Sequence, residues 1–214
     1  GSLDFRVYRE ALTRVAGALA ERYASRDGFF GIEVLGEPVV QQRRFLQVSA
    51  GVQPHVLRNY YRDAYAAVRS AAGPDVVVIL PEAGMTRAWG AFMAQSSYEN
   101  VWLDCHLLHH LDSVNVTGPA GGRQLSDTSR VSLESARKIG LPVMVGAWSG
   151  SLPFADTLMT PEGRIALERV YISEQIGTFR TCPAWFFQTW KTEARLSGWD
   201  ARVSLATFER RMLD

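Results

Sequence analysis

Hydrophobic and polar positions along the chain follow two alternating patterns. Where apolar residues recur three or four positions apart, as in residues 3–23 and 54–72, the spacing predicts amphipathic helices. Short, nearly continuous apolar runs predict buried strands at residues 29–35, 75–81, 100–105, 142–147 and 184–190. Further helices are predicted at residues 87–95, 126–139, 162–180 and 204–213. Apolar strands separated by helices predict an α/β fold with a parallel sheet covered on both faces.

One long segment fits neither pattern. Residues 107–129 are rich in Gly, Ser, Thr and Asp and follow a predicted strand directly. Loops of this length are usually functional or mobile. The segment has little apolar area to offset the entropy lost on ordering, so we expect a mobile loop or one ordered by a partner.

Composition narrows the class of protein. A chain of 214 residues suits a single β/α domain covering residues 1–214. Its 23 Lys and Arg balance 22 Asp and Glu, which gives no basic field for nucleic acid. No apolar run approaches the roughly 20 residues of a membrane span. Cys105 and Cys182 are too few to form a disulfide framework, so the cysteines do not indicate the cellular compartment of the protein.

The ends of the predicted strands carry the candidate chemistry, because βα loops line the functional crevice of parallel β/α folds. Glu37 precedes a proline and suits a general acid/base, although a solvated loop carboxylate fits equally well. His106 is suited to bind a substrate hydroxyl, and a structural hydrogen-bonding role is the alternative. Trp148 and Trp190 offer flat faces to sugar rings, and one of them is expected in the core. Ala147 ends its strand without any reactive group.

A metal site is the alternative for the histidine-rich segment. In a helix, His106 and His110 would share a face, with Asp104, Cys105 and His109 nearby. However, the segment begins at a strand end and lacks the glutamate of a His-Glu-x-x-His motif. Loop histidines are therefore favoured, and no metal is expected.

Together, "GIEVLGEP", "VWLDCHLLHHLD", "PVMVGAWSG" and "FFQTWKTE" resemble the second half of family 5 glycoside hydrolases, in the exo-β-1,3-glucanase branch. The resemblance runs over nearly the whole chain, from the helix before the fourth barrel strand to the eighth strand. It implies a partial (β/α)8 barrel made of strands four to eight, a β-linked glucan or oligosaccharide as ligand, and no cofactor. It also implies roles for four residues: Glu37 as acid/base, His106 beside the substrate, Trp190 stacked on sugar, and Ala147 at the nucleophile position.

Three positions depart from that family's pattern. Gly36 replaces an asparagine that contacts the sugar, Leu108 replaces a tyrosine, and Ala147 replaces the nucleophilic glutamate. Retaining hydrolysis needs two carboxylates about 5 Å apart, so Glu37 alone cannot supply both roles. An engineered Glu→Ala change would account for Ala147 but not for the other two departures.

The five predicted strands leave three barrel strands without a counterpart. The strands at 29–35 and 184–190 would become apolar sheet edges, which invite pairing with another chain. A homodimer or a second chain that completes the barrel is expected. Two functions stay open: a glycoside-hydrolase-like domain with weak or absent hydrolysis, and a non-catalytic scaffold that binds carbohydrate or protein.

Overall fold

The structure of the chain is a computed structural model that describes residues 5–41, 43–44, 47–84, 89–109, 119–153 and 160–206. Its strands are β1 (Gly31–Glu33), β2 (Arg43–Arg44), β3 (Gln47–Val48), β4 (Val77–Pro81), β5 (Val101–Leu107), β6 (Val143–Trp148) and β7 (Trp185–Phe187). Its helices are α1 (Phe5–Tyr23), α2 (Pro54–Ala72), α4 (Pro119–Arg137), α5 (Pro161–Phe179) and α6 (Ala201–Ser204).

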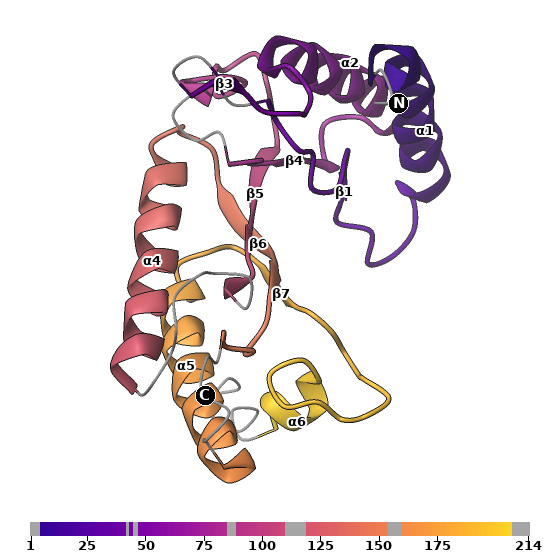
Figure 1. Ribbon diagram of the computed structural model, residues 1–214. Helices are drawn as coiled ribbons and strands as arrows, with labels where there is room; N and C mark the ends of the chain where they lie inside the picture. The colour runs from indigo at the N-terminus through magenta and orange to yellow at the C-terminus, as the bar shows by residue number, and fades with distance from the viewer. Residues whose placement is uncertain are drawn as a thin grey trace. The chain divides into compact units, whose positions relative to one another are not determined.

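Five strands form one sheet in the order β1-β4-β5-β6-β7 (Figure 1). The pairs β1 with β4, β4 with β5 and β6 with β7 run parallel, and α2, α4 and α5 lie in the connections. This arrangement confirms the predicted α/β fold with a parallel sheet. The chain divides into two compact units, Gly1–Asp104 with Ala136–Pro142 and Cys105–Ser135 with Val143–Asp214. Strand β5 passes from the first unit into the second.

In the first unit, α2 packs against β4 and α1 packs against α2. Helix α2 begins at Pro54, whose fixed φ suits the first turn of a helix. It ends at Gly73, where a φ of 74° stops the helix in a conformation that favours glycine. Both boundaries agree with the sequence, since proline and glycine flank the predicted helix.

Two buried tyrosines of α2 reach the carboxyl ends of neighbouring strands. The hydroxyl of Tyr60 donates to the carbonyl of Val34, just after β1, and the hydroxyl of Tyr61 donates to the carbonyl of Pro81 at 3.2 Å. Burial raises the pKa of Tyr60 to about 12, so this hydroxyl stays a proton donor at neutral pH. The two bonds fix the points from which the loops after β1 and β4 leave the sheet.

Strand register sorts the side chains of β1, β4 and β5 onto two faces. Glu33 is paired with Ile79, and Ile79 is paired with Trp102, so these three residues share one face. Asp104 and His106 follow Trp102 at alternate positions of β5 and therefore project from that same face. A charged and polar stripe thus runs along one side of β5.

The second unit is built around Trp148 at the end of β6. Its side chain is fully buried, and its ring meets Phe179 of α5 and both Trp185 and Phe187 of β7 edge to face. The centroid distances are 5.2, 5.5 and 4.8 Å, within the favoured range for aromatic pairs. Helix α5 starts after Thr160, whose hydroxyl accepts from the N–H of Gly163 at 3.2 Å. One aromatic cluster therefore joins β6, β7 and α5.

The irregular segment predicted at 107–129 is wrong over its second half, because α4 begins at Pro119. Burial of Leu125, Ser126 and Ser129 outweighs the poor helix propensity of the local glycines. Residues 110–118 of the segment lie outside the described residues, and the predicted mobility there stays a prediction. The antiparallel pair of β2 and β3 was not predicted. The helix expected at 87–95 is described only from residue 89, and residues 90–93 form turns. The last described helix, α6, ends before most of the helix expected at 204–213.

Candidate functional site

The loop after β1 presents Gly36 and Glu37 to solvent. Glu37 has a φ of 38°, a left-handed conformation that costs a residue with a side chain about 1–2 kcal/mol. A Cβ built on Gly36 would meet nothing within 4 Å, so the space around this position is open. Strained backbone on an exposed loop supports the hypothesis that Glu37 has a functional role.

The end of β5 carries His106 and, one residue past the strand, Leu108. Both side chains are half-buried. His106 therefore lies in a strand and not in a helix, so the spacing that would pair it with His110 on a helix face does not apply; His110 itself is outside the described residues. His109 is buried, and its Nε2 lies 2.7 Å from Oγ of Ser129 on α4, a structural hydrogen bond.

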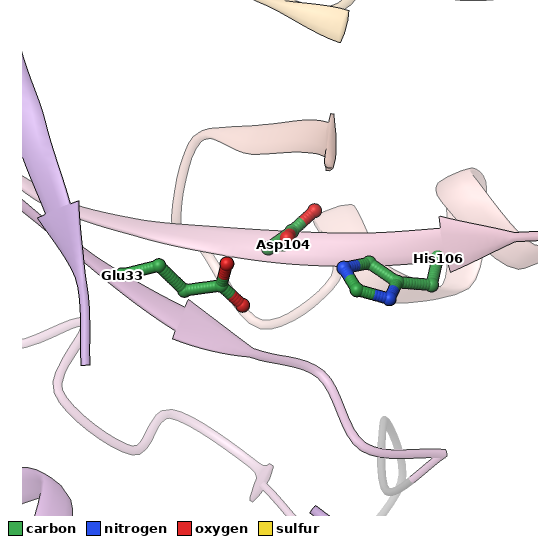
Figure 2. Close-up of side chains that lie close together, drawn as sticks. All are labelled: Glu33, Asp104 and His106. Carbon is green, nitrogen blue, oxygen red and sulfur yellow. The ribbon is translucent and has the colours of Figure 1, made fainter. Parts of the chain in front are cut away.

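A second group at β5 combines two carboxylates with one imidazole. Glu33 of β1 and Asp104 and His106 of β5 have donor atoms that all lie within 4.8 Å of one another. In Figure 2 the Glu33 carboxylate and the His106 ring point toward each other, with Asp104 beside them. Asp104 is only 2% exposed, whereas Glu33 is exposed.

The position of Glu33 also shows that the sheet is curved across β1, β4 and β5. β4 separates β1 from β5, and strands two places apart in a flat sheet lie about 9–10 Å apart. The Glu33 and Asp104 side chains nevertheless meet above β4, so this face of the three strands is concave. Glu33 was not predicted as a site residue. The available signal was a lone charged residue inside the apolar run at residues 29–35.

The end of β6 has no reactive side chain. Ala147 is 7% exposed, and the pairing of β6 with β7 is irregular between Val145 and Trp148, the stretch that contains it. Such irregularities re-aim side chains and are common beside active sites. Trp148 is enclosed by other aromatic rings and cannot stack on a sugar, so it is the core member of the two candidate tryptophans.

Trp190 follows β7 and is 68% exposed. The loop after it is fixed by buried Asp200, which accepts from Nη2 of Arg202 at 2.8 Å and from the N–H of Thr192 at 2.9 Å. Hydrogen bonding from the Arg202 side chain, then from the Thr192 backbone, holds the pKa of Asp200 far below its usual range. An ionised carboxylate thus anchors the loop two residues beyond Trp190.

Glu168 of α5 is a second buried carboxylate in this unit, and it accepts from the hydroxyl of Ser197. Burial raises the pKa of Glu168, although the Ser197 hydrogen bond and the Arg164 charge oppose the effect. Glu168 and Asp200 both serve the packing of the loop after β7. Neither is placed as an exposed acid/base.

No protein-family model matches the chain. A probable glucan 1,3-beta-glucosidase A of Emericella nidulans is 27% identical, over 88% of this chain and 51% of that protein. A probable glucan 1,3-beta-glucosidase of Arthroderma benhamiae is 25% identical, over 85% and 50%. The chain spans about half the length of the curated relatives it matches.

Solved structures share its fold. The endoglucanase of hyperthermophilic Thermotoga maritima superimposes with a TM-score of 0.61 at 16% identity, over 98% of this chain and 66% of that chain. A GH5-4 broad specificity endoglucanase from Clostridium acetobutylicum gives 0.57 at 17% identity, over 90% and 60%. The partial barrel fold predicted from the sequence is confirmed, and the chain is glycoside-hydrolase-like. None of the helices in the described ranges is long and apolar enough to cross a membrane.

Proposed function

We propose that this glycoside-hydrolase-like chain binds β-linked glucan and does not hydrolyse it through a glycosyl-enzyme intermediate. The observation that carries this proposal is the buried methyl group of Ala147 at the end of β6. The family 5 glycoside hydrolases that the sequence resembles have a nucleophilic glutamate at this position. A retaining glycosidase forms a covalent bond from that carboxylate to the anomeric carbon, and a methyl group can form none.

Glu37 is proposed as the remaining acid/base. It is exposed and strained, as a side chain that must meet a ligand would be. Protonation of a leaving group by Glu37 without a nucleophile opposite leaves the anomeric carbon without an electron pair to replace the departing oxygen. We expect binding without hydrolysis.

Sugar contact is proposed for Trp190, whose exposed ring offers an apolar face. His106 is proposed beside the ligand, while Gly36 and Leu108 line the site without the hydrogen-bonding side chains of the resembled pattern. Loss of those groups removes contacts that strengthen in the transition state and leaves stacking in place. This is the balance expected of a protein that retains binding and loses turnover.

Rescue by an external anion tests the missing nucleophile. Azide should attack the anomeric carbon of dinitrophenyl β-glucoside, break the bond to dinitrophenolate and yield α-glucosyl azide. We expect no enzymatic release without azide, and release that rises with azide concentration. Trp190→Ala should weaken rescue and glucan binding, whereas Phe186→Ala, which removes another exposed aromatic, should not. Turnover by the unmodified chain without azide would refute the proposal.

Ala147→Glu provides the complementary gain of function. Glutamate at this position should restore hydrolysis of the aryl glucoside, and Ala147→Gln should not, although it adds a side chain of the same size. Because the site is buried, circular dichroism must first show that both variants fold. Equal rates in the two folded variants would contradict the role of the position.

A partner chain is also proposed, either a second copy or another protein. In the described sheet β1 pairs only with β4 and β7 pairs only with β6, and Phe186 of β7 is 57% exposed. Apolar sheet edges favour association. Light scattering at micromolar concentration should show a dimer or larger assembly. Phe186→Lys should dissociate it, whereas Val131→Lys on α4, at an equally exposed position, should not. A strictly monomeric chain would overturn a homodimer, and absence of a stoichiometric partner from the native source would overturn a complex with another chain.

A further inference from the structure

We propose that Arg58 and Arg62 of α2 bind the phosphate group of a phosphate monoester. The two side chains lie on successive turns of the helix and share one aromatic ring. The Cζ atoms of Arg58 and Arg62 lie 5.8 and 5.0 Å from the ring centroid of Phe92. All three residues belong to the first compact unit. The proposed glucan chemistry uses none of them, so this site is separate from it.

A stack of aromatic rings forms the base of the site. The ring of Trp89 stacks on Tyr61 and on Phe92, with centroid distances of 5.4 and 5.1 Å. Its Nε1 donates to the carbonyl of Glu82 at 2.8 Å, and its side chain is buried. The Cζ atom of Arg58 lies 5.8 Å from the Trp89 centroid as well. Cation–π contacts of this kind hold a guanidinium in place and leave N–H donors for a ligand.

The charge of the two arginines is not balanced by the part of the chain that the structure describes. Asp63 is the one acidic residue in the sequence of α2, and it pairs with Arg9 of α1. Arg62 donates to the neutral side chain of Asn59 at 3.1 Å. Arg58 is half-buried, and its Nε is buried without a hydrogen-bond partner among the described residues. A partly desolvated cation without a counter-charge is costly, so an anion bound beside it would stabilise the folded chain.

The number of donors selects the class of anion. A carboxylate has two oxygen atoms, which one guanidinium fork satisfies. A phosphate monoester has three acceptor oxygens on a tetrahedral centre and a charge of about −1.5 to −2 at pH 7, which suits two forks on successive turns. Long side chains in a helix lean toward its N-terminus. The first turn of α2 has no acidic residue, so the helix dipole adds to the attraction for an anion.

The experiment titrates the whole chain with glycerol 3-phosphate at constant ionic strength, with glycerol as the uncharged match. Calorimetry should show saturable binding of one glycerol 3-phosphate per chain and no binding of glycerol. Vesicles of phosphatidylcholine with and without phosphatidic acid present the same phosphate chemistry as a lipid headgroup. Sedimentation with phosphatidic acid would assign the site to a membrane lipid, and binding of glycerol 3-phosphate alone would assign it to a small molecule.

Substitutions of the two arginines identify the site. Arg58→Gln and Arg62→Gln should each weaken binding of glycerol 3-phosphate at least about 10-fold, the usual value of a hydrogen bond to a charged group. Arg62→Lys keeps the charge and loses the planar fork, so it should also weaken binding. The matched control is Arg130→Gln on α4, an exposed arginine that pairs with Asp127 and Glu134 at 3.0 and 3.1 Å. This control should leave the affinity unchanged.

Arg62→Gln keeps the test decisive if half-buried Arg58 does not tolerate change. Its side chain is exposed, so the melting temperature without ligand and the binding of laminarin should both stay unchanged. Three results would overturn the site. They are the absence of saturable binding of glycerol 3-phosphate, an affinity unchanged by Arg62→Gln, and equal affinities of Arg62→Lys and the unmodified chain.

Discussion

The loop after β1 and the loops after β6 and β7 differ in what their carboxylates do. After β1, Glu37 is exposed on strained backbone, and Gly36 beside it has open space. After β6 and β7, the buried carboxylates Asp200 and Glu168 hold loop atoms in place. The first region has the character of a ligand-facing loop and the second that of a packed core.

The proposed function, in which hydrolysis is lost and glucan binding is kept, gives this difference a meaning. Ala147 and Trp148 sit within tight packing, where a small side chain is favoured. Glu37 lies on an exposed loop. If the comparison is right, substitutions after β6 should act on stability, and substitutions after β1 should act on ligand binding.

The largest effect is expected from Trp148→Ala. Removing a fully buried ring with three aromatic neighbours should cost about 3–5 kcal/mol in the free energy of unfolding. Trp190→Ala, at an exposed position, should change it by no more than about 0.5 kcal/mol while weakening glucan binding. Urea denaturation and binding to laminarin measure the two effects. Similar losses of stability in both variants would contradict the assignment of Trp148 to the core and Trp190 to the surface.

Two glycines give a smaller version of the same contrast. A Cβ at Gly150, after β6, would clash with Cδ1 of buried Ile172 and lie 3.3 Å from Cα of Gly198. Gly150→Ala should therefore cost about 1–3 kcal/mol. Gly36→Ala meets no atom within 4 Å and should be neutral or stabilise by up to about 1 kcal/mol. Thermal denaturation of both variants tests this, and a destabilised Gly36→Ala would mean that the loop after β1 is also closely packed.

Much of the fold could be predicted from the sequence because its signals are local. Nearly continuous apolar runs predicted all five strands of the main sheet, and proline and glycine marked both ends of α2. Helix α4 was predicted to begin too late because Gly121 and Gly122 lower helix propensity. Its start depends on burial of Leu125 and Ser129 against other segments, which no local pattern contains.

The candidate site was less accessible to sequence analysis. The ends of the predicted strands pointed to Glu37, His106 and Trp190 as candidates, because chain order fixes which residues follow each strand. It could not bring Glu33 to Asp104, since that contact depends on the curvature of a face across an intervening strand. It also could not decide which tryptophan is buried, a matter of side-chain packing in three dimensions.

The pH dependence of stability probes the packed region through Glu168. Its pKa is raised in the folded state, mainly by burial, so the stability it contributes is fully present below the unfolded value of about 4.3. That contribution is lost as the pH rises through the folded pKa. Glu168→Gln imitates the protonated form, and it should be more stable relative to wild type at pH 7 than at pH 4. Urea denaturation at both pH values measures this, and a constant difference would show that the carboxylate is not desolvated.

The smallest effect is expected at Glu37, and it tests the other side of the comparison. Glu37→Ala and Glu37→Gly both remove the carboxylate, but only glycine relaxes a φ of 38° without steric cost. Glu37→Gly should therefore be the more stable variant by about 1 kcal/mol, as measured by chemical denaturation. When combined with Ala147→Glu, both changes should abolish the release of an unactivated alkyl leaving group that Ala147→Glu alone is expected to provide. A glutamate that weakens the fold and is needed for that chemistry would be retained for its carboxylate. If the two variants are equally stable, backbone strain no longer supports a functional role for Glu37, and only its position after β1 does.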